Sequence, residues 1–351
     1  MAYTDIDKPS DYFNTVLYTG NNTSQSITGV GFKPDWVWCK SRNDGNNHNV
    51  FDSVRGVTKW IETDNTNAEQ TASNTLTSFN SDGFSVGDHG EINGGNDTQV
   101  SWCWKAGVSA SNNTDGQLTS SVSVNQDAGF SVLTYTGVGN GLPATARTVG
   151  HGLGVTPAVL IIKNRADSTQ FNVYHHKNTS APQTEIIYLN LARGTADDNG
   201  FWNDTAPTSS VFTVGGDNGV NGNNDSMVCY AFAEKQGYSK FNSYVGNGNV
   251  DGTFIYTGFK PALVIQKESG ADGEYWMMKD NKRETGNQTD ANLYPNANNV
   301  EGDTNGIDLL SNGFKCRTTG AGSNGSGKLY IYMAFAEQPF VTSTGVPATA
   351  R

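Results

Sequence analysis

The feature that most constrains the fold is a closing phrase that occurs three times along the chain. Each copy has a polar loop rich in Asn, Gly and Asp, then an aromatic-rich alternating strand, then an exit of small residues. The copies are DTQVSWCWKAG at 97–107, DSMVCYAFAEKQG at 225–237 and GSGKLYIYMAFAEQPF at 325–340. A unit that ends the same way three times predicts three diverged copies of one β structure.

The rest of each unit follows the same order. A Y-x-G strand leads to a G-F-x-P turn, an apolar strand ending in Lys, an aromatic strand and a G-F hairpin. In the first unit the apolar strand at 35–40 is expected to be half-buried, and the hairpin is expected at 76–86. The turn and apolar strand read GFKPDWVWCK at 31–40 and GFKPALVIQK at 258–267, with VTPAVLIIK at 155–163 in the second unit. A period on the order of 100 residues suits a sandwich rather than a solenoid coil.

These patterns predict six segments. They are an N-terminal arm at 1–10, repeat 1 at 11–107, a Ser/Asn/Gly-rich linker at 108–128, repeat 2 at 129–237, repeat 3 at 238–340, and a C-terminal tail at 341–351. The linker includes one candidate strand at 120–124. The sequence leaves open whether each repeat closes as its own sandwich or exchanges strands with a neighbour.

Composition agrees with a turn-rich β protein. Charged residues make up only 16% of the chain, which contains 41 Gly, and such chains form many short strands joined by tight turns. An aromatic content of 11% argues against disorder, and amphipathic stretches of helical period are absent. The predicted fold class is therefore all-β, with tandem β-sandwich units of the jelly-roll or lectin-like kind.

Charge and hydropathy exclude several partners. The net charge is −11 and no Lys/Arg cluster is longer than two residues, so we expect no nucleic-acid partner. No run of 18 apolar residues exists, which predicts no membrane insertion. The start, MAYTDIDKPSDYF, does not resemble a secretory signal, so synthesis in a cytoplasm is expected. The four cysteines lie far apart, outside any C-x-x-C pair, and are interpreted as buried free thiols.

No motif predicts an enzyme. GFSVG at 83–87 matches the G-x-S-x-G pattern of hydrolases, but no helix follows it, and the other units have Trp202 and Lys315 where this one has Ser85. His175 and His176 are adjacent on a predicted strand, so they point to opposite faces and cannot chelate one metal together. The carboxylates lie mostly in turns and do not form a glycosidase pair. Catalytic residues and a cofactor are therefore not predicted.

Two binding alternatives remain open. Calcium favours oxygen-rich loops, and the candidate ligands are Asp217, Asp225, Asp303 and Asp308, although turn formation explains the same residues. Sugar rings stack on exposed aromatic side chains, for which Trp60 and Trp202 are the candidates. Trp36 and Trp276 lie in alternating strands and are expected in the core.

The whole chain resembles a known group of proteins. The phrases FNTVLYTGNNTSQSITGVGFKPDWVWCKSR, VFDSVRG, FNSDGFSVGD, NGGNDTQVSWCWKAG and AFAEQPFVTSTGVPATAR resemble repeat-containing, virion-associated proteins of tailed phages, mostly phages of marine bacteria. The resemblance is clearest in the first unit and last strand, and weakens at 107–127 and 179–210. It implies a structural component of the particle, such as a tail fibre or other surface-exposed protein, and brings no catalytic residues with it.

The resemblance and the residues together predict a non-enzymatic virion protein present in many copies as a tail fibre or similar host-contact appendage. An outer capsid-associated decoration protein is one alternative, and a carbohydrate-binding host-recognition protein with depolymerase activity is another. Expected partners are other virion proteins, further copies of the chain (a trimer among the options) and a host surface glycan. The phrase PATAR recurs at 143–147 and 347–351, which suggests docking through the tail by Val346, Pro347 and Arg351.

Overall fold

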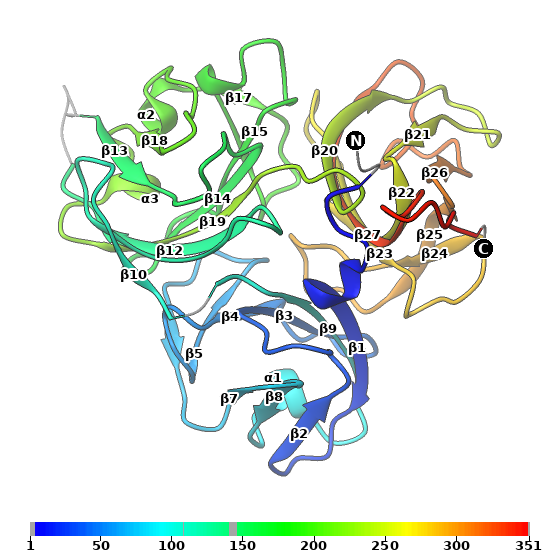
Figure 1. The fold of residues 1–351 in the computed structure, drawn as a ribbon, viewed down its shortest axis with the longest axis horizontal. Helices are drawn as coiled ribbons and strands as arrows, with labels where there is room; N and C mark the ends of the chain where they lie inside the picture. Colours follow the sequence, from blue (N-terminus) through cyan, green and yellow to red (C-terminus); the bar gives the residue numbers. More distant parts are fainter. Residues whose placement is uncertain (1–3, 108, 140–145, 350–351) are drawn as a thin grey trace.

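The computed structural model describes residues 4–107, 109–139 and 146–349, and arranges them as three lobes around a common centre (Figure 1). Lobe 1 contains β1 to β9, lobe 2 contains β10 to β19, and lobe 3 contains β20 to β27. The strands form antiparallel sheets, which confirms the predicted all-β class with sandwich-like units. The helices within the described residues span no more than four residues, and none could cross a membrane.

The elements of lobe 1 follow the 3-10 turn η1 (Pro9–Asp11) and are β1 (Phe13–Thr19), β2 (Gln25–Thr28), β3 (Trp36–Ser41), β4 (Asn49–Asp52), β5 (Lys59–Glu62), β6 (Gln70–Thr71), β7 (Leu76–Asn80), β8 (Gly83–Val86), α1 (Gly90–Asn93) and β9 (Thr98–Trp104). Those of lobe 2 are β10 (Ser111–Asn113), β11 (Ser120–Asn125), β12 (Phe130–Thr136), β13 (Arg147–Gly150), β14 (Val159–Asn164), β15 (Asn172–His175), η2 (Pro182–Thr184), β16 (Glu185–Tyr188), β17 (Ala196–Asp197), α2 (Asn199–Trp202), β18 (Val211–Val214), α3 (Asn218–Asn221) and β19 (Ser226–Phe232). Those of lobe 3 are β20 (Ser239–Val245), β21 (Phe254–Tyr256), β22 (Phe259–Glu268), β23 (Met277–Asp280), β24 (Thr289–Asn292), β25 (Gly302–Leu310), β26 (Gly313–Cys316) and β27 (Leu329–Pro339).

One pairing order recurs in all three lobes. The opening strand pairs with the closing strand, which pairs with the apolar strand, which pairs with the aromatic strand: β1-β9-β3-β4, β12-β19-β14-β15 and β20-β27-β22-β23. A second sheet accompanies each of these large sheets, namely β2-β8-β7, β13-β18 and β21-β26-β25-β24. It has fewer strands than the large sheet in lobes 1 and 2 and the same number, four, in lobe 3. The predicted hairpin at 76–86 forms the β7–β8 pair of the first small sheet.

The apolar strand of each large sheet is buried on both faces. In β3, Trp36 and Trp38 point toward the centre of the molecule, while Val37 and Cys39 point into the sandwich of lobe 1. All six residues of β3 are buried, although the sequence predicts a half-buried strand. The prediction is wrong because the neighbouring lobes cover the second face of the sheet, a contact between units that the alternation of one strand does not reveal.

The lobes share one core in addition to their own interiors. Each lobe encloses a separate apolar cluster between its two sheets. The largest cluster lies between the lobes and takes residues from all three. Within it the Trp36 ring lies 4.5 Å from the ring of Tyr230, and Phe335 lies 5.4 Å from Phe13 and 5.8 Å from Phe232, measured between centroids. Each lobe therefore closes its own sandwich. The second face of its large sheet, on the outside of that sandwich, is covered by the other lobes.

The predicted linker at 108–128 is partly built into lobe 2. Its candidate strand at 120–124 forms as β11, and β10 adds a further strand at the edge of the large sheet. β11 pairs with β12 in the register Val122↔Leu133. This segment differs from a free linker because Val122 and Leu133 are buried in the same cluster.

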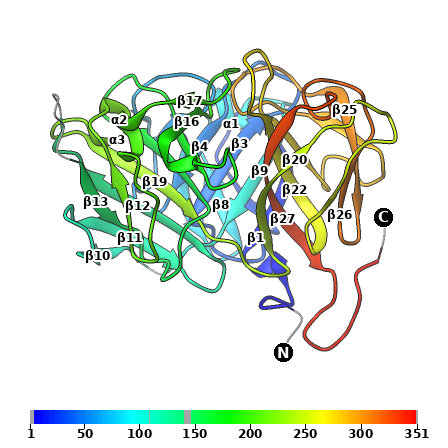
Figure 2. The same cartoon turned by 90° about the horizontal axis from the view of Figure 1, so that it is seen from above.

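The segment before β1 and the segment after β27 lie on the same side of the molecule (Figure 2). The Thr4 hydroxyl donates to the carbonyl oxygen of Gln236 at 2.9 Å, and the Ser343 amide donates to the carboxylate of Asp7 at 2.6 Å. The arm before β1 therefore contacts both the connection between lobes 2 and 3 and the segment that follows β27.

Candidate functional site

The three junctions between lobes are built on the same backbone contact. In each junction, a backbone amide of one lobe donates to a backbone carbonyl oxygen of the next lobe. The accepting residue stands two positions after the lysine at the end of that lobe's apolar strand (Lys40, Lys163 or Lys267). Glu69 donates to Arg165 at 2.9 Å, Glu301 donates to Arg42 at 2.7 Å, and Thr195 donates to Ser269 at 2.9 Å. The junctions therefore run cyclically from lobe 1 to lobe 2, from lobe 2 to lobe 3, and from lobe 3 to lobe 1.

The junction of lobes 1 and 2 is a buried ion-pair network. Arg55 pairs with Asp52 in its own lobe, and the Tyr230 hydroxyl of lobe 2 donates to the same Asp52 carboxylate at 2.9 Å. Glu69 then accepts from Arg55 at 3.1 Å and from both nitrogens of the Arg165 fork at 2.8 Å. A two-bonded guanidinium–carboxylate pair fixes direction as well as distance, so this network sets the orientation of the two lobes.

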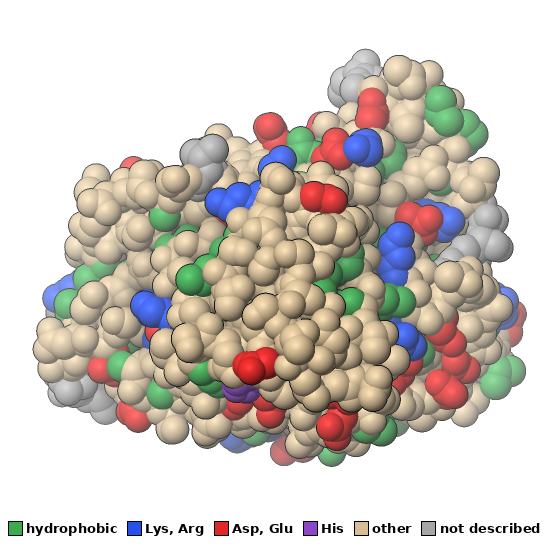
Figure 3. Space-filling view, turned by 90° about the horizontal axis from the view of Figure 1, so that it is seen from below, with side chains coloured by type: hydrophobic (Ala, Val, Ile, Leu, Met, Phe, Trp, Pro, Cys, Tyr) green, Lys and Arg blue, Asp and Glu red, His purple; other side chains and the backbone are tan. Residues whose placement is uncertain are grey.

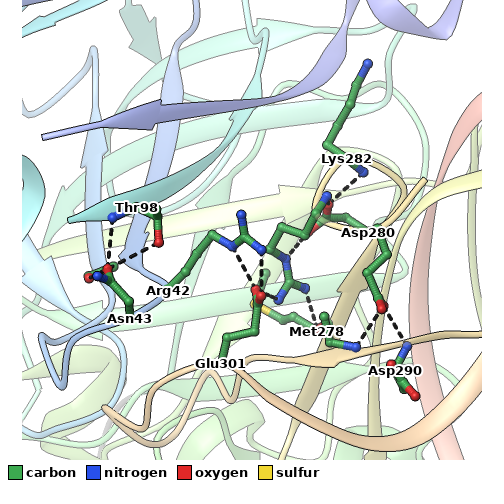
Figure 4. A network of polar contacts seen from close by, with 12 residues as sticks. Arg42, Asn43, Thr98, Met278, Asp280, Lys282, Asp290 and Glu301 are labelled. Atoms are coloured by element: carbon green, nitrogen blue, oxygen red, sulfur yellow. Dashed lines mark hydrogen bonds and ion pairs between the residues drawn. The ribbon is translucent and has the colours of Figure 1, made fainter. Parts of the chain in front are cut away.

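The junction of lobes 3 and 1 repeats this network with residues at the equivalent positions (Figure 4). Asp280 accepts from Arg283 at 2.6 Å and from the indole nitrogen of Trp102 at 3.1 Å. Glu301 accepts from Arg283 at 2.8 Å and from two nitrogens of Arg42 at 3.0 and 2.6 Å. Trp102 therefore donates to Asp280 as Tyr230 donates to Asp52 at the other charged junction.

The two glutamates that cross these junctions, Glu69 and Glu301, stay ionised despite burial. Burial alone would raise the pKa of Glu301, but hydrogen bonding to Arg42 and the charge of Arg283 outweigh it and hold that pKa below its usual value. Glu69 follows the same rule, with Arg165 and Arg55 lowering its pKa. Each junction therefore depends on its arginines, since either carboxylate alone would be a costly buried charge.

The junction of lobes 2 and 3 has neutral residues at the equivalent positions. His175 stands where Asp52 and Asp280 stand, and its Nε2 lies 3.1 Å from the carbonyl oxygen of Tyr332. Asn178 replaces the arginine three residues on, and the Thr195 hydroxyl donates to its side-chain oxygen at 2.8 Å. Ser269 replaces the second arginine. The three junctions therefore share a backbone geometry but not a charge pattern.

We expect His175 to make stability depend on pH. Burial, with a smaller effect of His176, lowers the pKa of His175 to about 3. In the unfolded chain the histidine has a pKa near its ordinary value, so the unfolded chain takes up the proton at a higher pH than the folded chain. The free energy of unfolding therefore decreases as pH falls from about 6.5 toward 3. Between pH 7 and pH 4 the native chain should lose roughly 3 kcal/mol more than a His175→Gln variant, as measured by urea unfolding. Equal losses in the two proteins would contradict the assignment.

Each apolar strand ends in a buried lysine. The ammonium group of Lys40 donates to the carbonyl oxygens of Ser41 at 2.6 Å and Asp44 at 3.0 Å. Lys163 donates to the Thr66 carbonyl of lobe 1 at 3.2 Å, and Lys267 donates to the carbonyl of Glu268. Burial lowers the pKa of each of these lysines to about 8. Backbone carbonyl groups, rather than carboxylates, satisfy these cations.

The structure does not bring the predicted calcium ligands together. Asp217 accepts from the Gly219 amide and caps α3, Asp225 accepts from Asn164, and Asp308 pairs with Arg317, while Asp303 is exposed. Among the residues that the structure describes, no group of three or more His, Cys, Asp or Glu is placed to hold a metal ion. Three of the four candidate aspartates therefore form a helix cap, a side-chain hydrogen bond and an ion pair.

The predicted sugar-stacking residues are buried, so that prediction is wrong. Trp60 is 6% exposed and Trp202 is 1% exposed, and the indole nitrogen of Trp202 donates to the carbonyl oxygen of Glu185. Trp36 and Trp276 are in the core, as expected, and all four cysteines are free and buried. Alternation marks tryptophans that point inward along a strand, but Trp202 is the last residue of the short helix α2, where no such pattern applies.

Other predicted positions are distributed over the surface. Val346 is 55% exposed, Pro347 lies in the same surface segment, and Arg351 lies outside the described residues. The hydroxyl of Ser85 lies 3.0 Å from that of Ser26 on the outer sheet of lobe 1. The face in Figure 3 consists mostly of uncharged polar side chains and backbone, with acidic and basic groups scattered across it.

A surface pocket lies where lobes 2 and 3 are joined. It is lined by Glu234, Lys240 and Tyr256 together with the turn at 235–237 and Thr257. Tyr256 is 54% exposed, and Lys240 pairs with Glu234 at 2.9 Å. No sequence pattern marks these residues, because they lie in a connection and in a short strand of lobe 3.

Comparison with known proteins gives a family but no activity. One family model, described as a domain of unknown function (DUF7483), matches residues 8–339. No curated protein and no solved structure matches the chain.

Proposed function

The chain belongs to the DUF7483 family, which supplies no activity, and we propose that it is a non-enzymatic structural protein of a phage particle, carried in many copies as a host-contact appendage. The observation that carries this proposal is the core shared by the three lobes. A common core and two buried ion-pair networks hold the loops of all three lobes in fixed relative positions. The resemblance of the sequence to virion-associated phage proteins supports the proposal that the protein is part of a phage particle.

The mechanism is display by a rigid body. Loops at the ends of sandwiches are the usual places of recognition, because they vary without disturbing the sheets. Many copies on one particle would make weak single contacts effective through multivalency. We assign attachment to the particle, to other virion proteins or to further copies of the chain to the side where the segment before β1 contacts the segment after β27.

The tail supplies a direct test of this attachment. Deleting residues 342–351 should reduce incorporation into particles at least about tenfold, because the tail and the arm before β1 form the proposed docking end. Incorporation is measured by quantitative immunoblotting of purified particles. The folded body should keep its melting temperature, since this segment lies outside the four apolar clusters. Normal incorporation of the deletion variant would contradict the docking assignment.

The location on the particle is tested by electron microscopy of intact phage with a gold-labelled antibody against the folded protein. Label at the tail tip or along fibres would support the host-contact appendage. Label over the head would favour the alternative of a capsid-associated decoration protein. An absence of label on particles that contain the gene would refute a virion role.

A carbohydrate-binding role is the second candidate, and the Tyr256 pocket favours it. An exposed tyrosine ring beside a carboxylate and an ammonium group offers a stacking surface with charged hydrogen-bonding groups, as sugar sites do. A glycan array distinguishes this role from a purely architectural one. Binding that a Tyr256→Ala variant loses would establish it.

A further inference from the structure

A second pocket lies at the neutral junction of lobes 2 and 3. Asn178, Thr179, Glu185, Thr195 and Asp197 line it from lobe 2. From lobe 3 it is lined by residues 269–270 at the end of β22 and by residue 329 at the start of β27. The pocket therefore lies where the two charged junctions have their arginine–glutamate pair.

At the charged junctions this position is filled from within the chain. Arg165 and Arg42 each extend from the position that follows the buried lysine by two residues, and each forms a two-bonded pair with a glutamate across the junction. At the neutral junction the same position is Ser269, which lacks the length to cross it. The junction of lobes 2 and 3 therefore has the same backbone contact as the two charged junctions but no guanidinium group at this position.

The lining of the pocket is polar, and two of its buried polar atoms have no hydrogen-bond partner in the described chain. Ser269 is 1% exposed, and its hydroxyl has no hydrogen-bond partner among the residues that the structure describes. The Oε2 atom of Glu185 is also buried and without a partner in the described chain. Buried polar atoms of this kind are rare in folded proteins and call for an explanation.

The charge of the pocket is negative. Glu185 and Asp197 are opposite one another in the β16–β17 pair, so two carboxylates face one small region. Burial, opposed by a hydrogen bond from Thr179, and the charge of Asp197 raise the pKa of Glu185. Two neighbouring carboxylates without a cation between them attract one.

We propose that this pocket binds a guanidinium group, presented either by a small molecule or by an arginine side chain of a protein partner. The carboxylate of Glu185 and the hydroxyl of Ser269 accept its hydrogen bonds, and the carboxylate of Asp197 supplies a second negative charge beside it. A planar guanidinium group fits better than an ammonium group, because the equivalent positions hold guanidinium forks against carboxylates.

The test uses the full chain and L-argininamide as the probe, with L-lysinamide for comparison. Binding is followed by isothermal titration calorimetry and by the shift in melting temperature. We expect saturable one-to-one binding of L-argininamide that is at least about fivefold tighter than that of L-lysinamide. Dissociation constants in the micromolar range would indicate a small-molecule ligand. Millimolar constants would indicate a site for one arginine of a larger partner surface.

Two variants and one control decide whether the binding occurs at this pocket. Glu185→Gln removes an acceptor charge and should weaken L-argininamide binding at least about tenfold. Ser269→Arg supplies the guanidinium from within the chain, so it should abolish binding and raise the melting temperature. Asp303→Asn removes an exposed carboxylate elsewhere and should leave binding unchanged. The proposal is overturned if wild-type protein shows no saturable binding, or if both pocket variants bind the probe as the control does.

Discussion

Replacing Arg283 with methionine is expected to destabilise the chain by about 3–5 kcal/mol, the cost of leaving buried carboxylates without their cation. The guanidinium of Arg283 is fully buried and pairs with both Asp280 and Glu301. Methionine fills a similar volume, so the loss isolates the charge. Urea unfolding at pH 7 measures it, and the loss should shrink toward pH 4, where protonation of the carboxylates removes the need for a cation.

Arg317 provides the matched control. It also pairs with two carboxylates, Asp308 and Asp251, but its side chain is 37% exposed. Solvent screens such pairs, so Arg317→Met should cost no more than about 1 kcal/mol. If the two substitutions cost the same, the lobe junctions would not depend on buried charge.

Replacing Trp36 with alanine is expected to lower the stability of all three lobes together. Trp36 is 2% exposed, and its ring lies 4.4 Å from that of Trp104 in its own lobe and 4.5 Å from that of Tyr230 in lobe 2. Removing a buried tryptophan costs about 3–5 kcal/mol. For a chain of this size, that corresponds to a fall of roughly 5 °C in melting temperature.

Differential scanning calorimetry provides the decisive measurement. Because the central cluster belongs to no single lobe, both the native chain and the Trp36→Ala variant should melt in one cooperative transition. Val245→Ala, at a position that is 55% exposed, should leave the transition in place. Two or three separate transitions, only one of which shifts in the variant, would show instead that the lobes are independent domains.

The sequence predicts the interior of each lobe well and the contacts between lobes poorly. Sequence patterns placed the hairpin at 76–86 and one buried face of β3, because such patterns depend on residues close in the chain. The second buried face of β3 depends on lobes 2 and 3, which no local pattern describes. Trp202 is an exception inside a lobe, because it packs against Tyr174, a residue of lobe 2 that is distant in the chain.

The junction residues carry a signal that the repeats could have revealed. Asp52 and Arg55, and Asp280 and Arg283, have the same D-x-x-R spacing in equivalent strands, and the apolar strand ends in lysine in every unit. Charged residues at fixed positions beside buried strands indicate a desolvated network rather than a surface pair. Their partners Glu69 and Glu301 lie in loops of unequal spacing, so the sequence alone could not place them.

The cyclic order of the junctions has a consequence for assembly. Each lobe presents one surface to the lobe before it and a different surface to the lobe after it, which is the head-to-tail arrangement of a ring-forming oligomer. Here a single polypeptide completes the ring, and the contact of lobe 3 with lobe 1 closes it without a covalent connection between them. A homotrimer must use one interface three times, whereas this chain can vary each of its three interfaces separately. The chain therefore gains the rigidity of a closed trimer while each junction stays free to acquire a role of its own.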